Sequence, residues 1–288
     1  MVRIGSDLAS AAHRQREPPP RDEHAAANRE SVPRMTSWSD HPLCGPRDAM
    51  PSAFWGPEKL DSAAFVELVD LLSPDAEIAA LLVALKDIKQ VVDVGGGTGL
   101  LTQAIAKGAE VTVIDPDPAQ RALVPGGIIV ADGRAEAVPL PDRATEAAIA
   151  TWVLQYCDDP LRAVDELARI ARHRVVIVQA APGNDLVEVY NREAEIAGLP
   201  RAHHGWLLAH AATHLEAAGF TVTLQRIAIP VRAPAGGAEQ LATTLARLHF
   251  AGHPKLAEMI AATTPMIGRT LAIGSTLSDD GVLLSARR

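Results

Sequence analysis

The fold is decided by the stretch Val91-Val92-Asp93-Val94-Gly95-Gly96-Gly97-Thr98-Gly99-Leu100, in which an apolar run containing one acid leads into glycines. This pattern predicts a strand, a tight loop and the N-terminus of a helix. Gly95, Gly97 and Gly99 lack a Cβ, so the backbone can turn sharply and lie against a ligand, while the free N–H groups of the helix face the same point. The stretch therefore favours a nucleotide-like ligand.

The spacing of the glycines excludes the dinucleotide fingerprint. Counted from Gly95 and Gly97, G-x-G-x-x-G would need a glycine at position 100, which is Leu100. The next predicted strand, 110–114, is followed by Asp115, 20 positions after Gly95. A carboxylate at that place can accept hydrogen bonds from both hydroxyls of a ribose. An adenosine ligand without a pyrophosphate agrees best with these residues.

A third predicted strand, 128–131, is followed by Asp132 and Gly133, so three successive strands end in acids. With this series the sequence resembles the class I S-adenosylmethionine-dependent methyltransferases, in particular the group of the ubiquinone/menaquinone methyltransferases and small-molecule tailoring enzymes. The resemblance covers residues 88–186.

The resemblance implies S-adenosylmethionine as cofactor, S-adenosylhomocysteine as product, and transfer of a methyl group to an oxygen or nitrogen of a small molecule in secondary metabolism, such as antibiotic biosynthesis. In such a family the glycine loop and its acid hold the methionine part, the acid after the second strand holds the ribose, and the third acid holds the adenine. The implied cofactor-binding residues are Asp93, Gly95, Gly97, Gly99, Asp115, Pro116, Asp132, Gly133 and Thr151. Two alternatives stay open, because function depends on the site and not on the fold. They are a non-methylating reaction of the same fold, such as cyclisation or decarboxylation, and a non-catalytic partner subunit.

The expected fold class is α/β, with a Rossmann-like, seven-stranded, mostly parallel sheet whose last strand is antiparallel, as the resemblance implies. Strands are predicted near 90–94, 110–114, 128–131, 146–152, 174–179, 220–230 and 281–286, and helices near 57–72, 74–86, 160–171, 207–218, 239–251 and 255–264. The predicted organisation is a disordered tail at 1–34, an N-terminal helical cap segment at 35–87, a core at 88–230 and 281–288, and a helical insert at 231–280. The insert is interpreted as a lid or as a dimer contact.

Candidate catalytic residues follow the fifth predicted strand. His204, and after it His203 and Tyr190, lie before or near a predicted helix, and a histidine there could deprotonate a hydroxyl or an ammonium group near neutral pH. The alternative is that either histidine caps or packs against the helix start. The expected substrate-pocket residues, which could equally be core residues, are Trp152, Gln155, Trp206, His249 and Phe250. No metal site is predicted, because His210 and His214 share a helix face without a third ligand.

Composition limits the partners. The chain of 288 residues has a formal net charge of −8 and no basic cluster, which argues against nucleic-acid substrates. No window reaches about 18 uninterrupted apolar residues, so no membrane span is expected. The only cysteines, Cys44 and Cys157, lack metal-ligand spacing and favour a reducing compartment, which predicts a cytoplasmic enzyme. A small-molecule acceptor is the expected partner, and a homodimer stays open as the alternative to a lid for the insert.

Overall fold

The computed structural model describes residues 37–44, 61–199, 206–233, 237–273 and 276–288, without the side chains of Ser62 and Trp206. Residues Met35–Arg288 belong to one compact unit. The predicted tail at 1–34 lies outside the described residues.

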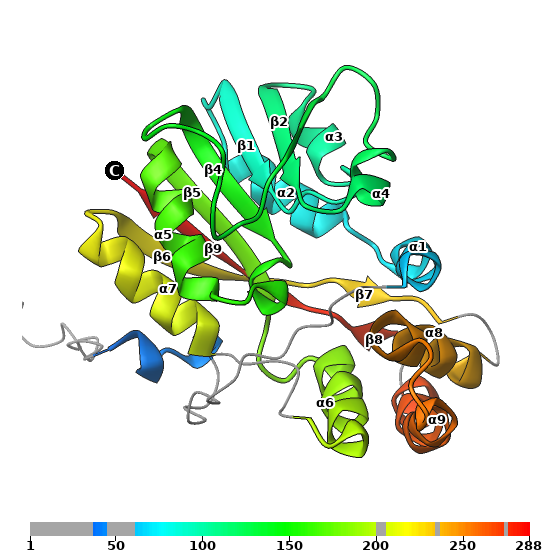
Figure 1. The fold of residues 1–288 in the computed structure, drawn as a ribbon. Coiled ribbons are helices and arrows are strands. Elements are labelled where there is room, and N and C mark those ends of the chain that lie inside the picture. The colour runs from blue at the N-terminus through cyan, green and yellow to red at the C-terminus, as the bar shows by residue number, and fades with distance from the viewer. Residues whose placement is uncertain (1–36, 45–60, 200–205, 234–236, 274–275) are drawn as a thin grey trace, which may run out of the picture. The chain divides into compact units, whose positions relative to one another are not determined.

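The described residues contain a seven-stranded sheet of order β3-β2-β1-β4-β5-β9-β6 (Figure 1). Its strands are β1 (Gln90–Val94), β2 (Glu110–Asp115), β3 (Ile129–Asp132), β4 (Thr145–Thr151), β5 (Ala171–Ala180), β6 (Thr221–Ile227) and β9 (Gly281–Arg287). The pairs from β3 to β5 are parallel, whereas β9 lies between β5 and β6 and is antiparallel to both. The predicted fold class, with its antiparallel last strand, is confirmed.

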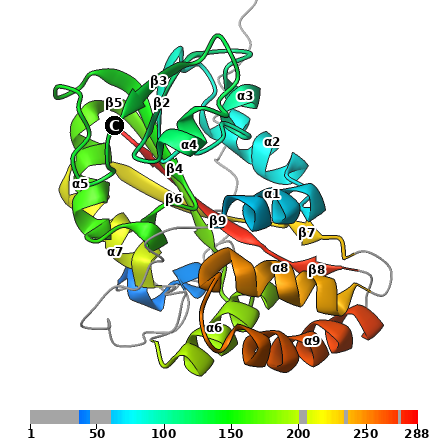
Figure 2. The ribbon, with the colours of Figure 1, turned by 45° about the vertical axis from the view of Figure 1, so that its right-hand side comes forward.

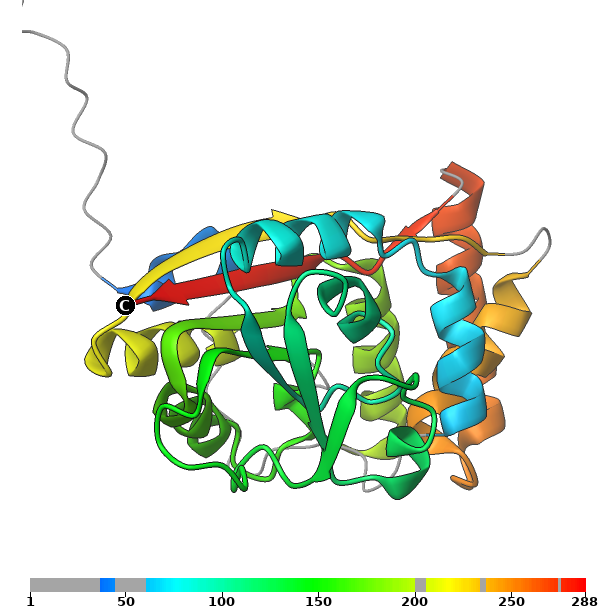
Figure 3. The same ribbon diagram turned by 90° about the horizontal axis from the view of Figure 1, so that it is seen from above.

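Both faces of the central strands are covered, which explains why β1, β4 and β5 are rich in buried apolar residues, whereas the edge strands β3 and β6 are more exposed. Successive residues point to opposite faces, so Val92 packs in a cluster with α5 (Pro160–Ile170) and α7 (Trp206–Ala217). Val91 packs on the other face with α2 (Asp75–Ala84) and α3 (Thr102–Ile105). Figure 3 shows α2 and α7 on opposite sides of β6 and β9. Four short helical segments complete this part: α4 (Pro118–Arg121), η1 (Trp38–Asp40), η2 (Pro42–Cys44) and η3 (Leu154–Tyr156).

A second group of helices packs around its own apolar cluster (Figure 2). We call it the helical layer, and it comprises α1 (Ser62–Leu71), α6 (Asp185–Ala197), α8 (Ala238–Phe250), α9 (Leu256–Ile273) and the short ribbon of β7 (Pro230–Val231) and β8 (Leu277–Ser278). Side chains of all these elements meet in one cluster, which includes Leu68, Leu186, Leu245, Ile267, Val231 and Leu277. Segments distant in the sequence therefore build one layer.

The helix α6 is absent from the sequence prediction. Its start is marked by Asn184, whose side chain accepts hydrogen bonds from Leu186 N and Val187 N. Gly198 ends it in the left-handed conformation, with φ of 77°. An asparagine before an acid, followed by a helical spacing of apolar residues, was the available signal.

Two other boundaries differ from prediction. The sixth strand ends at Ile227 and not at Pro230, which instead begins β7. The helix predicted to end at 264 continues through Pro265 to Ile273. Proline usually ends a helix because it lacks an N–H. Here the helix continues on both sides of it, since Met259 and Ile267 are completely buried in the helical layer.

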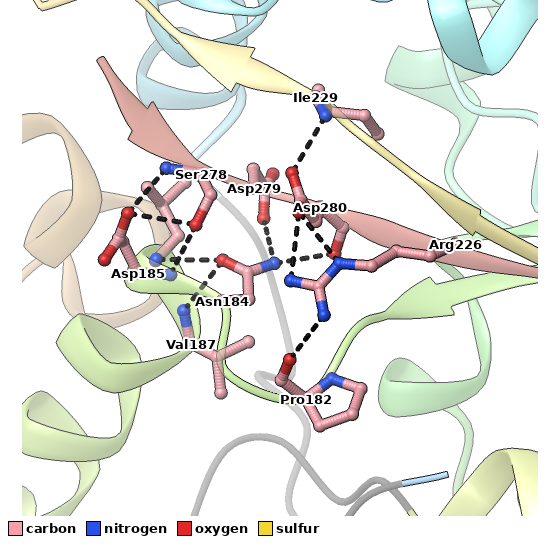
Figure 4. A network of polar contacts seen from close by, with 10 residues as sticks. Pro182, Asn184, Asp185, Val187, Arg226, Ile229, Ser278, Asp279 and Asp280 are labelled. Atoms are coloured by element: carbon pink, nitrogen blue, oxygen red, sulfur yellow. Dashed lines mark hydrogen bonds and ion pairs between the residues drawn. The ribbon is translucent and has the colours of Figure 1, made fainter. Parts of the chain in front are cut away.

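The polar network in Figure 4 connects the sheet to the helical layer. Asn184 Nδ2, at the start of α6, donates to Asp279 Oδ1 at 3.1 Å and to the carbonyl of Asp280 at 2.8 Å. Asp280 in turn accepts from Ile229 N at 3.1 Å and from Arg226 Nε at 3.0 Å. The junctions β5–α6, β6–β7 and β8–β9 are thereby held against one another.

Candidate active site

The loop after β1 needs the glycines that the sequence places there. Gly95, Gly97 and Gly99 have φ values of 73°, 54° and 76°, a region that favours glycine. A Cβ on Gly95 would lie 2.5 Å from Val153 Cγ2, closer than packed atoms come. The Gly95 N–H also donates to Ile114 O at 2.6 Å. The loop is thus held tightly between β2 and the end of β4.

Asp93 lies beneath this loop. Its side chain is 1% exposed and accepts a hydrogen bond from the Thr102 hydroxyl at 2.5 Å. A Cβ on Gly96 would lie 2.8 Å from Asp93 Oδ2, so the carboxylate contacts the loop backbone. Burial raises the pKa of Asp93 to about 6, against the lowering effect of Thr102. Its Oδ1 is buried without a hydrogen-bond partner, an arrangement that is costly unless a ligand donates to it.

Asp115 joins the loops that follow β1 and β2. Its Oδ2 accepts from Gly97 N at 3.0 Å, and its Oδ1 accepts from Asp117 N at 2.8 Å. Burial raises the pKa of this carboxyl, while the two N–H groups lower it. Each carboxylate oxygen can accept more than one hydrogen bond, so Asp115 keeps the capacity to bind a diol.

Asp132 stands beside Asp115 at the same edge, because the two residues are register partners in β2 and β3. Arg121 binds both of them: its guanidinium donates to Asp132 Oδ1 at 2.7 Å and to the carbonyl of Asp115 at 2.6 Å. The Asp132 side chain is 75% exposed and can reach a ligand. A Cβ on Gly133 would lie 2.7 Å from Pro139 Cδ, so this turn also requires glycine.

Two polar residues of α4 belong to this region although the sequence analysis did not select them. Arg121 fixes the acids described above, and Gln120 lies over Gly97, where a Cβ would be 3.6 Å from Gln120 Oε1. That oxygen is buried without a partner. Their position shortly after Asp115 was the only available signal. Pro116, between Asp115 and α4, is exposed.

The end of β4 carries a second set of polar contacts. Thr151 is the last residue of the strand, and Trp152 follows with φ of 60°. Trp152 Nε1 donates to Glu77 Oε1 at 2.8 Å, and its carbonyl accepts from Gln155 Nε2 at 2.9 Å. Burial raises the pKa of Glu77 to about 7. No local pattern marks Glu77, because its partner is 75 positions away.

Rings from the helical layer gather beside this segment. The Tyr156 hydroxyl lies 3.4 Å from His249 Nε2, and the ring centroids of Tyr190 and His249 are 4.6 Å apart in an edge-to-face arrangement. Burial raises the pKa of Tyr156 to about 12 and that of Tyr190 well above its ordinary value, so both hydroxyls keep their protons. Tyr190 and His249, which the sequence proposed separately, are thus neighbours.

Phe250, another proposed pocket residue, follows His249 at the end of α8. Phe250 is 5% exposed and packs with Met259 and Ile196 inside the helical layer. His203, His204 and the side chain of Trp206 lie outside the described residues. His214 Nδ1 lies 3.0 Å from Asp165 Oδ1, and the described residues contain no group of three side chains that could hold a metal ion. None of the helices within the described ranges combines the length and apolar character needed to cross a membrane.

The order and direction of the strands define a Rossmann-like fold of the methyltransferase type. Residues 92–178 match the family described as "Methyltransferase domain". The 2-methyl-6-phytyl-1,4-hydroquinone methyltransferases 1 and 2 of Oryza sativa subsp. japonica are 32% and 33% identical over 91 residues, which is 29% of this chain. That match spans only 28% and 26% of their own lengths.

Solved structures agree on the fold. A protein described as a methyltransferase from an antibiotic biosynthesis pathway of Anabaena variabilis has a TM-score of 0.55 at 16% identity, covering 73% of this chain and 95% of its own. A Bacillus halodurans protein described as a methyltransferase has a TM-score of 0.52 at 20% identity, covering 75% and 99%. Residues 92–178 therefore carry a methyltransferase domain with the class I fold, and S-adenosylmethionine is the cofactor of that class.

Proposed function

We propose that this chain is a methyltransferase that moves a methyl group from S-adenosylmethionine to an oxygen or nitrogen of a small molecule. The observation that carries the proposal is the carboxyl edge of β1, β2 and β3, where Asp115 is bonded to Gly97 and lies beside Asp132. This edge is where open α/β sheets bind ligands. The family match covers residues 92–178, and the proposal assigns methyltransferase activity to the whole chain.

The residues at this edge fit the cofactor chemically. Asp115 would bind the ribose diol, and Asp132 with the Gly133 N–H would bind the adenine. The loop with Gly95, Gly97 and Gly99, together with Asp93, Pro116 and Thr151, would hold the remainder. Two buried acceptors without partners, Asp93 Oδ1 and Gln120 Oε1, suit a ligand that carries ammonium and hydroxyl donors. When bound, the cofactor supplies a methyl group on a positively charged sulfur.

The chain itself has to orient the acceptor and exclude water. Orientation of two reactants can supply roughly 7 to 11 kcal/mol of such a barrier. Trp152, Gln155, Tyr190 and His249 lie where the end of β4 meets the helical layer, and we propose that they line the acceptor pocket. Trp206 and Phe250 as pocket residues, and His203 and His204 as bases, stay predictions from the sequence.

The insert helices α8 and α9 are proposed to act as the lid of this pocket. His249 of α8, which lies against Tyr156, supports that role. The alternative is that the insert forms a contact between two copies of the chain. Measuring the molecular mass of the protein in solution distinguishes a monomer from such a dimer. Secondary metabolism, including antibiotic biosynthesis, and a cytoplasmic location also remain predictions from the sequence.

Calorimetric titration with S-adenosylmethionine and S-adenosylhomocysteine tests the proposal first. We expect micromolar binding of both. Mass spectrometry of reaction mixtures should then show products about 14 mass units heavier than their acceptors, the mass of one added CH₂. Absence of binding would overturn the proposal. Binding accompanied by products of unchanged mass, or by loss of carbon dioxide, would instead assign a non-methylating reaction to the same fold.

A further inference from the structure

The segment after β4 connects the glycine loop to the helical layer. Val153 contacts the Gly95 position, and one turn later Tyr156 N donates to Val153 O at 2.8 Å. The Tyr156 hydroxyl then reaches His249 of α8. Val153 and Tyr156 thus connect the proposed cofactor site to the helical layer.

Two carboxylates approach this segment from other parts of the chain. Glu77 of α2 accepts the Trp152 indole N–H at 2.8 Å. Asp279 lies two positions before Gly281, where a Cβ would be 3.2 Å from Trp152 Cζ2. Burial raises the pKa of Glu77, Tyr156 and Tyr190, and the negative charge of Asp279 adds to the rise at each of them. These two acids and the neighbouring polar and aromatic residues are called the acidic cluster below: Glu77, Asp279, Trp152, Gln155, Tyr156 and Tyr190.

In the part of the chain that the structure describes, neither carboxylate has a cationic partner. Asp279 accepts only a neutral amide N–H, from Asn184 at 3.1 Å, and Glu77 accepts only the neutral indole. Arg226 is close to this network in Figure 4, but it is bonded to Asp280 at 3.0 Å and to the carbonyl of Pro182 at 3.1 Å. Burial raises the pKa of Glu77 to about 7 and that of Asp279 to about 6, as expected for acids without a counter-charge.

Gln155 provides an independent indication of a ligand. Its side chain is 7% exposed, and its Nε2 is used by the Trp152 carbonyl at 2.9 Å. Its Oε1 is buried without a hydrogen-bond partner, while its amide also interacts with the Tyr156 hydroxyl. A buried acceptor left unpaired costs about 1–3 kcal/mol. The described residues supply no hydrogen-bond donor to Gln155 Oε1, so a donor on a bound ligand would satisfy it.

We propose that the methyl acceptor is an amine that enters as an ammonium ion and is held at the acidic cluster by Glu77, Asp279 and Gln155, beside the rings of Tyr156 and Tyr190. This inference rests on the proposed function and narrows its acceptor class. An ammonium group offers several N–H donors and one positive charge, whereas a hydroxyl offers a single donor. Tyrosine faces also attract cations. An anionic acceptor would be repelled by the two acids.

The acids also supply the proton acceptor that the reaction requires. The ammonium nitrogen has no lone pair until one of its protons moves to the carboxylate of Asp279 or Glu77. The neutral nitrogen then forms the N–C bond to the methyl carbon, the C–S bond breaks, and its electron pair stays on sulfur. The products are an N-methylammonium ion, a neutral thioether and a protonated carboxyl, so charge is conserved. A base whose pKa lies near the working pH suits this step.

Three matched probes test the proposal: benzylamine, benzyl alcohol and benzoate, each titrated calorimetrically into protein saturated with S-adenosylhomocysteine. We expect benzylamine to bind at least tenfold more tightly than the other two. The heat of benzylamine binding should also differ between phosphate and Tris buffers at pH 7. The bound cation displaces protons from the two acids, and these protons are taken up by the buffer. Glu77→Gln and Asp279→Asn should each weaken benzylamine at least tenfold and leave the affinity for S-adenosylhomocysteine unchanged.

The control is Asp165→Asn, which removes a carboxylate that lies beside His214 on α7. It should change neither affinity. Equal binding of alcohol or benzoate, no benzylamine binding by protein that binds S-adenosylhomocysteine, or wild-type benzylamine affinity in both folded variants would each overturn the amine acceptor. If a variant does not fold, discrimination among the probes by the wild type decides the question. Failure to bind S-adenosylhomocysteine would overturn the proposed function itself, and this inference with it.

Discussion

The backbone N–H of Gly97 donates to Asp115 Oδ2 at 3.0 Å, which joins the loop after β1 to the end of β2. The same carboxylate accepts from Asp117 N at 2.8 Å. Asp115 is therefore oriented before any ligand arrives, so little ordering is needed when a ribose binds.

Replacing Asp115 with Ala tests this orientation. We expect S-adenosylmethionine to bind at least tenfold more weakly, since hydrogen bonds to charged groups contribute about 1.5–3 kcal/mol each. Calorimetry measures the affinity, and far-UV circular dichroism checks the fold. Glu195→Gln, at an exposed ion pair with Arg192, is the control and should bind normally. An unchanged affinity in the Asp115 variant would remove the ribose contact.

Gly95→Ala should abolish cofactor binding through sterics alone. The residue has φ of 73°, and the new Cβ would lie 2.5 Å from Val153. We also expect a loss of about 1–3 kcal/mol in the free energy of unfolding from overpacking and strain. Gly108→Ala is the matched control, because no atom lies within 4 Å of a Cβ there. If Gly95→Ala bound the cofactor normally, the close packing of the loop on Val153 would not be needed for cofactor binding.

Glu193 should make the protein less stable as the pH rises. Its side chain is fully buried, neither oxygen has a hydrogen-bond partner, and burial raises its pKa from 4.5 to about 8. Between these two values the folded state holds a proton that the unfolded state has lost. Stability therefore falls with rising pH across this window, by at most about 1.4 kcal/mol per pH unit from this group.

Urea unfolding at pH 5, 6, 7 and 8 measures this dependence. Glu193→Met should flatten the profile and raise the stability at pH 8. Glu195→Gln, a change on the exposed side of the same helix, should leave the slope as in the wild type. Identical slopes in the wild type and Glu193→Met would show that this carboxyl is not the group responsible.

Asn184→Ala should lower stability more than the loss of an ordinary helix cap does. Its side chain caps α6 and also donates to Asp279 and Asp280. Asp159→Ala is the comparison, because Asp159 Oδ1 only caps α5 by accepting from Arg162 N. This change should lower the free energy of unfolding by about 1 kcal/mol. We expect about 1–3 kcal/mol more for Asn184→Ala, measured by urea unfolding. Equal losses would mean that the link between sheet and helical layer adds no stability.

The part of the candidate site that depends on local order could be predicted from the sequence. The apolar run before Gly95, the glycine spacing and the acids after three successive strands predicted the sheet, its loop and the edge where Asp115 and Asp132 meet. This succeeded because parallel strands end at the same edge, and because a loop backbone with positive φ strongly favours glycine. Each of these signals lies within a few residues of the position it explains.

The contacts around Trp152 and Tyr156, by contrast, could not be predicted from any local pattern. Glu77 meets Trp152 across 75 positions, and Tyr156 meets His249 across 93. Asp279 joins them because β9 inserts between β5 and β6, which brings the β8–β9 junction beside Asn184. Such contacts have no period or spacing in the chain. They follow from the packing of the helical layer, where apolar burial selects one arrangement among many that the local pattern permits.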